Sequence, residues 1–349
     1  MTDTPGLVVG MGTVTVVDSI MSERPAPALP ATVFITGANG FIARALAARL
    51  RELGTAVRGV DLVASPADGI VAGSTVDPAP WAGQLAGVDA VIHTAAVVSN
   101  AAPLDAAWEV NVLGTQRVLR AAVAAGVPRF VHISSIAAYG FDFPDGVTES
   151  DPARVSGYSY VDTKVNSEHV VLAAEAAGEI ATTIIRPGDV WGPASRPWTI
   201  IPLEMIGKGQ MILPANGSGI FSPIYIDNLI DGMVLAIASK DAVGQIFNLT
   251  DGYGISCSDY FGRLATMAGG KVRTLPTPAA LLLTTTLGAI QRRLGMPSEL
   301  TAATVEMLHR TGTYSVEKAR TVLGFEPLVS LDEGMARVEH WARAQGLIR

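Results

Sequence analysis

The sequence predicts an α/β protein built on a doubly wound parallel sheet, with a smaller region at its C-terminal end. Short apolar segments alternate with longer helical patterns through the first half of the 349 residues. That alternation is typical of strand–helix–strand units and of a parallel sheet covered on both faces. Hydrophobic residues make up 49% and charged residues 16% of the chain. This leaves ample apolar material for a core and excludes a disordered chain.

The elements follow in order from residue 31. The first helical pattern has apolar residues at helical spacing and stops at Gly54, and the strands are short and apolar. We expect strands at 32–36, 56–61, 70–73, 89–94, 129–134 and 182–186, and helices at 41–53, 104–125 and 159–177. Beyond Pro187 the loops are richer in Pro and Gly. There, 222–238 and 256–268 are expected to form a strand or turn followed by a helix.

Composition excludes several classes of function. The 25 basic and 32 acidic residues give a net charge of −7, so nucleic acid is not an expected partner. The single Cys257 and five scattered histidines predict neither a disulfide framework nor a metal site. No apolar run reaches the ~18 residues of a membrane helix, and we expect a cytoplasmic protein. The mean hydropathy of +0.35 leaves open an apolar substrate cavity or peripheral contact with a membrane surface.

A glycine turn joins the first strand to the first helix in the segment TGANGFIA, residues 36–43. Gly37 permits a tight turn, and Gly40 lets the backbone approach a pyrophosphate at the helix N-terminus. Asn39, Phe41 and Ile42 complete the expected dinucleotide cradle. A purely structural strand–helix turn is the alternative.

Asp61 ends the second strand, 24 positions after Gly37. A carboxylate there accepts hydrogen bonds from an adenosine ribose and repels a 2′-phosphate, so the sequence favours NAD over NADP. Leu62 and Val63 add no positive charge. The nearby Arg44 and Arg58 leave a mixed preference open.

The strongest chemical signal is Tyr160 with Lys164, four residues apart on one helical face. An ammonium beside a phenol lowers the pKa of the phenol, so Tyr160 is a candidate general acid/base for interconverting a hydroxyl and a carbonyl. Tyr158 lacks a lysine at that spacing. Ser134 and Ser135 end an earlier strand, and ligands of parallel sheets bind at the carboxyl ends of the strands.

The chain resembles an extended short-chain dehydrogenase/reductase from residue 31 to its end. Beside TGANGFIA and Asp61, the resemblance is carried by DAVIHTAA (89–96), NVLGT (111–115), FVHISSIAAYG (130–140), YVDTK (160–164), RPGDVWGP (186–193) and SPIYIDNL (222–229). It implies that Ser135 is the catalytic hydroxyl, Tyr160 the acid/base, Lys164 its electrostatic partner, and Asn111 a residue that orders a water relay. It further implies cofactor contacts at Ser74, Thr75, Thr94, Ala95, Ala96, Ser134, Tyr160, Lys164, Pro187, Gly188 and Val190.

The resemblance also implies how the chain is divided. Residues 1–30 form an extension whose proline-rich end, 22–30, is a linker. A Rossmann-type NAD-binding domain covers 31–190 with returning segments near 220–250, and 191–349 form mainly a substrate-binding and lid region. The alanine-rich helices 104–125 and 159–177 imply a homodimer.

The substrate is expected to be a small apolar molecule. Asp189 stands where sugar-nucleotide members of the family carry an Asn, and it would repel a diphosphate. Phe221 stands where they carry an Arg. The apolar helix 275–294 and the segments 314–320 and 323–327 resemble the 3β-hydroxysteroid dehydrogenase branch. Flavonoid or aryl ketone and aldehyde reductases, nucleotide-sugar epimerases or dehydratases, and a non-catalytic NAD(P)-sensing protein remain alternatives.

Overall fold

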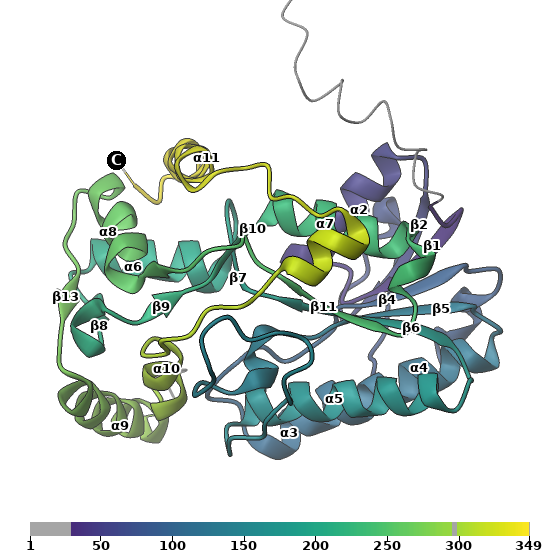
Figure 1. Ribbon diagram of the computed structural model, residues 1–349, viewed down its shortest axis with the longest axis horizontal. Helices are drawn as coiled ribbons and strands as arrows, with labels where there is room; N and C mark the ends of the chain where they lie inside the picture. Colours follow the sequence, from purple (N-terminus) through teal and green to yellow (C-terminus); the bar gives the residue numbers. More distant parts are fainter. Residues whose placement is uncertain (1–28, 295–298, 349) are drawn as a thin grey trace, which may run out of the picture.

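The computed structural model describes residues 29–294 and 299–348. Nearly all of the expected extension 1–30, including its linker, therefore lies outside the described residues. Within them, the central sheet has seven parallel strands in the order β11-β6-β5-β4-β1-β2-β3. The order reverses between β1 and β4, which is the doubly wound topology that the sequence predicts (Figure 1). The strands are β1 (Thr32–Thr36), β2 (Ala56–Asp61), β3 (Ile70–Ala72), β4 (Ala90–His93), β5 (Arg129–Ile133), β6 (Ala181–Pro187) and β11 (Gln245–Leu249).

Helices cover both faces of this sheet (Figure 1). One face carries α2 (Phe41–Glu52) and α7 (Ile226–Ala238), and the other carries α3 (Leu104–Trp108), α4 (Gly114–Ala124) and α5 (Ser159–Ala176). Successive side chains of a strand point to opposite faces. Val33 and Ile35 of β1 therefore join a core with α2 and α7, whereas Phe34 joins a second core with α4 and α5.

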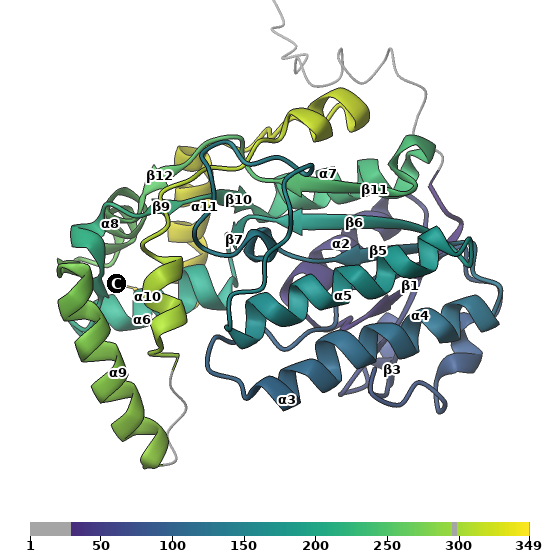
Figure 2. The ribbon, with the colours of Figure 1, turned by 60° about the horizontal axis from the view of Figure 1, so that its bottom comes forward.

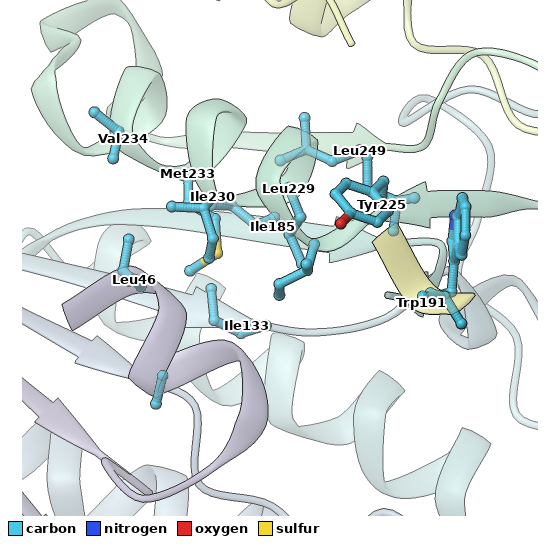
Figure 3. Close-up of a cluster of buried hydrophobic side chains, with 14 of the residues drawn as sticks. Leu46, Ile133, Ile185, Trp191, Tyr225, Leu229, Ile230, Met233, Val234 and Leu249 are labelled. Atoms are coloured by element: carbon cyan, nitrogen blue, oxygen red, sulfur yellow. The ribbon is translucent and has the colours of Figure 1, made fainter. Parts of the chain in front are cut away.

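The first of these cores is continuous from the sheet into the C-terminal region. Figure 3 shows Leu46 of α2, Ile133 and Ile185 of the sheet, and several side chains of α7 converging in one layer. The same core reaches Trp191, which is fully buried and contacts Tyr225 edge-on, with ring centroids 5.0 Å apart. The central sheet and the C-terminal region thus share one apolar core.

The C-terminal region is built from short strand pairs and five helices among the described residues (Figure 2). The strands are β7 (Asp189–Trp191), β8 (Ile212–Leu213), β9 (Ile220–Phe221), β10 (Pro223–Tyr225), β12 (Ile255–Ser256) and β13 (Arg273–Thr274). The helices are α6 (Ile201–Gly207), α8 (Cys257–Met267), α9 (Thr277–Arg293), α10 (Ala302–Met307) and α11 (Leu331–Ala344). None of the described helices is long and apolar enough to span a membrane.

The C-terminal segment returns to the sheet and packs at several places. The backbone N–H of Ile220 donates to the carbonyl of Arg310 over 2.7 Å. A Cβ added at Gly232 would lie 3.1 Å from the Phe325 ring, and one at Gly334 would lie 2.4 Å from the Trp191 ring. These two glycines allow residues 319–344 to lie directly against α7 and β7.

The structure corrects the expected helix 104–125 and adds elements. That stretch contains a π-helical segment, η3 (Glu109–Leu113), between α3 and α4. The expected strand 70–73 ends at Ala72, and the expected helix 159–177 ends at Ala176. Strand β11 and helix α11 were not expected individually. Further short helices are η1 (Pro66–Asp68), η2 (Ala82–Leu85), η4 (Ile136–Tyr139), η5 (Arg196–Ile200), η6 (Ala215–Gly217), η7 (Lys240–Ala242) and η8 (Ala319–Leu323).

Candidate functional site

The glycine turn between β1 and α2 has the geometry of an anion cradle. Gly37 has φ +67°, and a Cβ placed on it would lie 2.8 Å from the Cα of Ala95. Gly40 begins the 12-residue helix α2 without a side-chain cap, so the first N–H groups of that helix remain available to a ligand. The buried Oδ1 atom of Asn39 has no hydrogen-bond partner. These features fit a dinucleotide whose pyrophosphate lies on Gly40, Phe41 and Ile42.

Asp61 lies at the carboxyl end of β2, directly beside this turn. Its Oδ2 accepts from the backbone N–H of Asn39 over 2.9 Å, and its Oδ1 accepts from that of Leu62 over 2.7 Å. Leu62 and Val63 are exposed, by 77% and 69%. Arg58 donates to the carbonyl of Ala86 over 3.1 Å, so that guanidinium already has a partner. The carboxylate fits the ribose of NAD.

Polar side chains hold the carboxyl end of β4 to Thr36, the residue before the glycine turn. Thr94 Oγ1 donates to the carbonyl of Thr36 over 2.7 Å. The buried ring of His93 contacts Thr36 Oγ1 at 2.7 Å and Thr115 Oγ1 at 2.9 Å. Burial and, to a smaller extent, the charge of the nearby Lys164 lower the pKa of His93 to about 3. His93 is therefore a neutral structural residue, and Ala95 with Ala96 follows it along the edge.

Asn111 lies on the π-helical segment η3 and is fully engaged. Its Oδ1 accepts from the N–H of Val97 over 2.7 Å, and its Nδ2 donates to the carbonyl of Val97 and to Thr163 Oγ1, both over 3.0 Å. Its own carbonyl accepts from Thr115 Oγ1 over 2.6 Å. These contacts make Asn111 a clamp between the loop after β4 and helix α5, and its expected role in a water relay stays a prediction.

Ser135, Tyr160 and Lys164 converge beyond the end of β5. Ser135 precedes η4, where its Oγ accepts from the N–H of Ala137 over 3.1 Å, and its hydroxyl lies close enough to the Tyr160 phenol to lower the pKa of that phenol. The Lys164 Nζ atom lies 6.0 Å from the centroid of the Tyr160 ring and donates to the carbonyl of Ile133 over 2.8 Å. A phenol, a hydroxyl and an ammonium therefore share one location.

The electrostatics of this group differ from the expectation. Burial raises the pKa of Tyr160, the hydrogen bond with Ser135 opposes that rise, and the charge of Asp189 adds to it. The net shift of the Tyr160 pKa is therefore opposite to the expected lowering, while the Lys164 ammonium, 6.0 Å from the ring centroid, donates to the carbonyl of Ile133. Burial lowers the pKa of Lys164 to about 8, and the carboxylate of Glu168 opposes that change.

A buried ion pair beneath these residues was missed from the sequence. Arg186 donates to both carboxylate oxygens of Glu168, over 2.8 Å from Nε and 2.6 Å from Nη2. Ser134 Oγ donates to the same carboxylate, which directs Ser134 inward, away from its expected role as a cofactor contact. Arg186 also lies over the ring of Tyr139, 4.5 Å from its centroid. The signal in the sequence was the glutamate one helical turn after Lys164.

Asp189 is buried against Arg310, with which it forms an ion pair, and it accepts from the N–H of Ser222 over 2.9 Å. The expectation that Asp189 would repel a diphosphate did not allow for this pairing, in which the guanidinium of Arg310 neutralises the carboxylate. Arg310 was not singled out from the sequence. Burial raises the pKa of Asp189, and the charge of Arg310 opposes that rise.

The remaining expected cofactor contacts lie at two places, one at the end of β6 and in β7, and the other after β3. Pro187 ends β6, Gly188 donates its N–H to the carbonyl of Leu249 over 2.8 Å, and Val190 lies in β7. Ser74 and Thr75 follow β3. Thr75 is buried, and its Oγ1 would lie 3.0 Å from a Cβ placed on Gly114, so Thr75 packs against α4.

Aromatic side chains line the C-terminal region beside Asp189. Phe221 is fully buried and stacks on Tyr260 with ring centroids 3.8 Å apart. Trp198 meets Phe221 edge-on at 4.9 Å, and its carbonyl accepts from the Tyr260 hydroxyl over 2.8 Å. In the part of the chain that the structure describes, no group of three His, Cys, Asp or Glu residues could hold a metal ion.

Comparison with known proteins agrees with this geometry. The family model that matches residues 33–250 is that of the NAD dependent epimerase/dehydratase family. A 3 beta-hydroxysteroid dehydrogenase/Delta 5-->4-isomerase of Mycobacterium tuberculosis is 29% identical over 87% of this chain and 88% of its own length. A 2-alkyl-3-oxoalkanoate reductase of Stenotrophomonas maltophilia is 28% identical over 88% of this chain and 98% of its own. A crystal structure of a short-chain dehydrogenase/reductase superfamily protein from Agrobacterium tumefaciens, with bound NAD, superimposes with a TM-score of 0.71 and 26% identity, over 90% of this chain and 98% of that one.

Proposed function

Because this chain belongs to the NAD dependent epimerase/dehydratase family, and is thus an NAD-dependent oxidoreductase of the extended short-chain dehydrogenase/reductase type, we propose that it interconverts a secondary alcohol and a ketone on an apolar substrate, specifically a 3β-hydroxysteroid or sterol. One observation carries the reaction type. The Tyr160 phenol lies beside the Ser135 hydroxyl, which lowers its pKa, and the centroid of its ring is 6.0 Å from the Lys164 ammonium.

Each of the three side chains has a separate task in the proposed oxidation. Tyr160 accepts the proton of the substrate hydroxyl at its phenolic oxygen. Ser135 donates a hydrogen bond to the same substrate oxygen and stabilises the charge that develops there. Lys164, fixed by its hydrogen bond to Ile133, provides the positive charge that favours the phenolate of Tyr160. The bound NAD supplies the acceptor for the hydride that leaves the carbinol carbon.

The proposed NAD site runs along the carboxyl edge of the sheet. The diphosphate is assigned to the turn Gly37–Gly40 and the start of α2, and the adenosine ribose to Asp61. The remaining contacts are assigned to Thr94, Ala95 and Ala96 after β4, and to Pro187, Gly188 and Val190 beside the nicotinamide. Ser74 and Thr75 are proposed for the adenine side. Ser134 is not proposed, because its hydroxyl is bonded to Glu168.

Two observations support an apolar substrate. The cluster of Phe221, Tyr260 and Trp198 lies beside Asp189, which accepts from the N–H of Ser222, the residue after Phe221. The charge of Asp189 raises the pKa of both Tyr160 and Tyr260. The Mycobacterium tuberculosis relative is named for a 3β-hydroxysteroid. Reduction of a ketone, a 3-oxoalkanoate for example, is the second candidate, because the Stenotrophomonas maltophilia relative is named for that activity. An aryl ketone reductase has no separate support.

A substrate panel tests the proposal. Formation of NADH is followed with 3β-hydroxysteroids and with aryl alcohols, oxidation of NADH with 2-alkyl-3-oxoalkanoates, and conversion of UDP-glucose by chromatography. Turnover of the steroid with higher kcat/KM than every other compound is the expected result. Turnover of UDP-glucose alone would contradict the proposal and favour an epimerase.

We also propose a homodimer whose interface includes α5 and the α3–η3–α4 stretch. The two helices lie side by side on one face of the sheet (Figures 1 and 2), and the side chain of Leu104 on α3 is 45% exposed. A second copy would cover such a surface symmetrically. Light scattering at micromolar concentration is expected to give twice the chain mass, and a monomer mass would contradict the assignment.

A further inference from the structure

The carboxylate of Glu168 joins three elements beneath the proposed catalytic side chains. Its side chain is 2% exposed and lies on α5. It accepts hydrogen bonds from Ser134, which follows β5, and from both Nε and Nη2 of Arg186 in β6. Glu168 thus fixes helix α5 against the carboxyl ends of two strands.

Helical spacing places Glu168 on the same face as the proposed acid/base pair. Tyr160, Lys164 and Glu168 follow one another at four-residue steps along α5. Lys164 Nζ donates to the carbonyl of Ile133, and Glu168 accepts from the hydroxyl of the next residue, Ser134. The two side chains therefore hold consecutive residues of the strand end that leads directly into Ser135.

Glu168 also favours the charged form of Lys164. Arg186 is bonded to Glu168 and lies over Tyr139, and Asp189 is paired with Arg310. From β4 and β5, His93 and His132 face Lys164, and burial together with the Lys164 charge keeps both neutral. Glu168 is the acidic side chain whose charge opposes the effect of burial on Lys164. The titratable groups that interact with Lys164 are His93, His132, Tyr160 and Glu168, and Arg186 is bonded to Glu168.

We infer that Glu168 is a positioning residue for the reaction: its bonds to Ser134 and Arg186 align Ser135 with Tyr160, and its charge keeps Lys164 in the ammonium form. This inference rests on the proposed function of Tyr160 and Lys164. It assigns Glu168 no contact with substrate. The expected consequence is a dependence of the alkaline side of the pH–rate profile on the Glu168 charge.

The substitution Glu168→Gln tests this directly, because glutamine keeps the shape and can still accept from Ser134 but removes the charge. With the alcohol that supports NADH formation, we expect the alkaline limb of kcat to move to lower pH by about one unit. At a pH above the alkaline midpoints of both enzymes, such a shift makes Glu168→Gln about tenfold slower than the unsubstituted enzyme. The direction follows because removal of a negative neighbour makes the Lys164 ammonium easier to deprotonate.

Glu175→Gln is the matched control. Glu175 lies on the same helix and also bonds to β6, through the N–H of Thr182, but it is seven residues beyond Glu168. Its substitution is expected to lower the unfolding temperature. The midpoint of the alkaline limb of the pH–rate profile is expected to stay the same as in the unsubstituted enzyme. An unchanged limb in Glu168→Gln, or an equal shift in Glu175→Gln, would overturn the inference.

Two further variants keep the outcomes separable. If Glu168→Gln does not fold, the pair Glu168→Gln with Arg186→Met removes the buried unpaired guanidinium. A smaller alkaline shift in the same direction is then expected, because this pair removes a positive charge together with the nearer negative one. Normal turnover by Tyr160→Phe would refute the proposed function itself. Loss of turnover by Tyr160→Phe together with an unchanged limb in the Glu168 variants would refute only the role of Glu168.

Discussion

Replacement of Gly37 by alanine separates backbone strain from steric conflict at the proposed cofactor site. Gly37 has φ +67°, a region that costs an L-residue roughly 1–2 kcal/mol. The new Cβ would also lie 2.8 Å from the Cα and 2.9 Å from the N of Ala95. Both atoms belong to the backbone, so relief requires the loop after β4 to move. Overpacking of this kind costs typically about 1–3 kcal/mol more.

Gly54 provides the comparison. It has φ +88°, and a Cβ placed on it would meet nothing within 4 Å. Gly54→Ala therefore carries the left-handed strain alone, and Gly37→Ala carries strain and conflict. We expect the free energy of unfolding, from urea transitions of equal slope, to fall by about 1–3 kcal/mol more for Gly37→Ala.

Titration with NAD completes the assay. Movement of the loop at Ala95 disturbs the cradle, so Gly37→Ala is expected to weaken NAD binding at least tenfold, about 1.4 kcal/mol. Gly54→Ala is expected to bind NAD as the unsubstituted protein does. Equal losses of stability in the two variants, with NAD binding intact in both, would refute the argument that Ala95 restricts position 37.

Three other predictions concern single side chains. Tyr160→Phe is expected to lower kcat by about 10²–10⁴-fold with NAD affinity nearly unchanged, while Tyr158→Phe, measured with the same substrate, stays close to normal; the reverse order would contradict the assignment. The unsubstituted protein is expected to bind NAD at least tenfold more tightly than NADP, a difference of ~1.4 kcal/mol, and Asp61→Ala is expected to reduce this difference by admitting the 2′-phosphate. Calorimetric titrations with both cofactors check this. Tighter binding of NADP by the unsubstituted protein would count against it. Arg310→Met leaves Asp189 buried without a cation and is expected to lower the free energy of unfolding by about 3–5 kcal/mol. Adding Asp189→Asn to the same chain should restore part of that loss. No recovery in urea unfolding would argue against the ion pair as the cause.

Local patterns predicted the first half of the fold well. The apolar run of β1, the glycine turn and the amphipathic α2 are adjacent in sequence, so their hydrophobic spacing is sufficient to predict them. Strand β11 was harder, because residues 245–249 pair with β6 across a long excursion of the chain. The π-helical segment η3 carries Asn111, whose bonds to Val97 no helical periodicity indicates.

Charge pairing explains what the sequence could not predict in the site. Asp189 and Arg310 are 121 positions apart, and nothing in either local sequence indicates the other. The expected effect of Lys164 on Tyr160 assumed an ammonium beside the phenol, but in the structure the ammonium donates a hydrogen bond to the carbonyl of Ile133. Spacing along a helix predicts which residues share a face, whereas the direction of a long side chain depends on the strand packed against it.

The return of the C-terminal segment has a consequence for the order of synthesis. Trp191 packs against Gly334, Gly232 against Phe325, and Asp189 against Arg310. A nascent chain that has already produced β1 to α7 therefore still lacks partners for a buried carboxylate and for two aromatic contacts. Formation of such contacts between distant residues is slow and comes late in folding. A chain that stops before residue 310 is expected to expose this surface and to depend on chaperones, so the sheet and the C-terminal region mature as one unit.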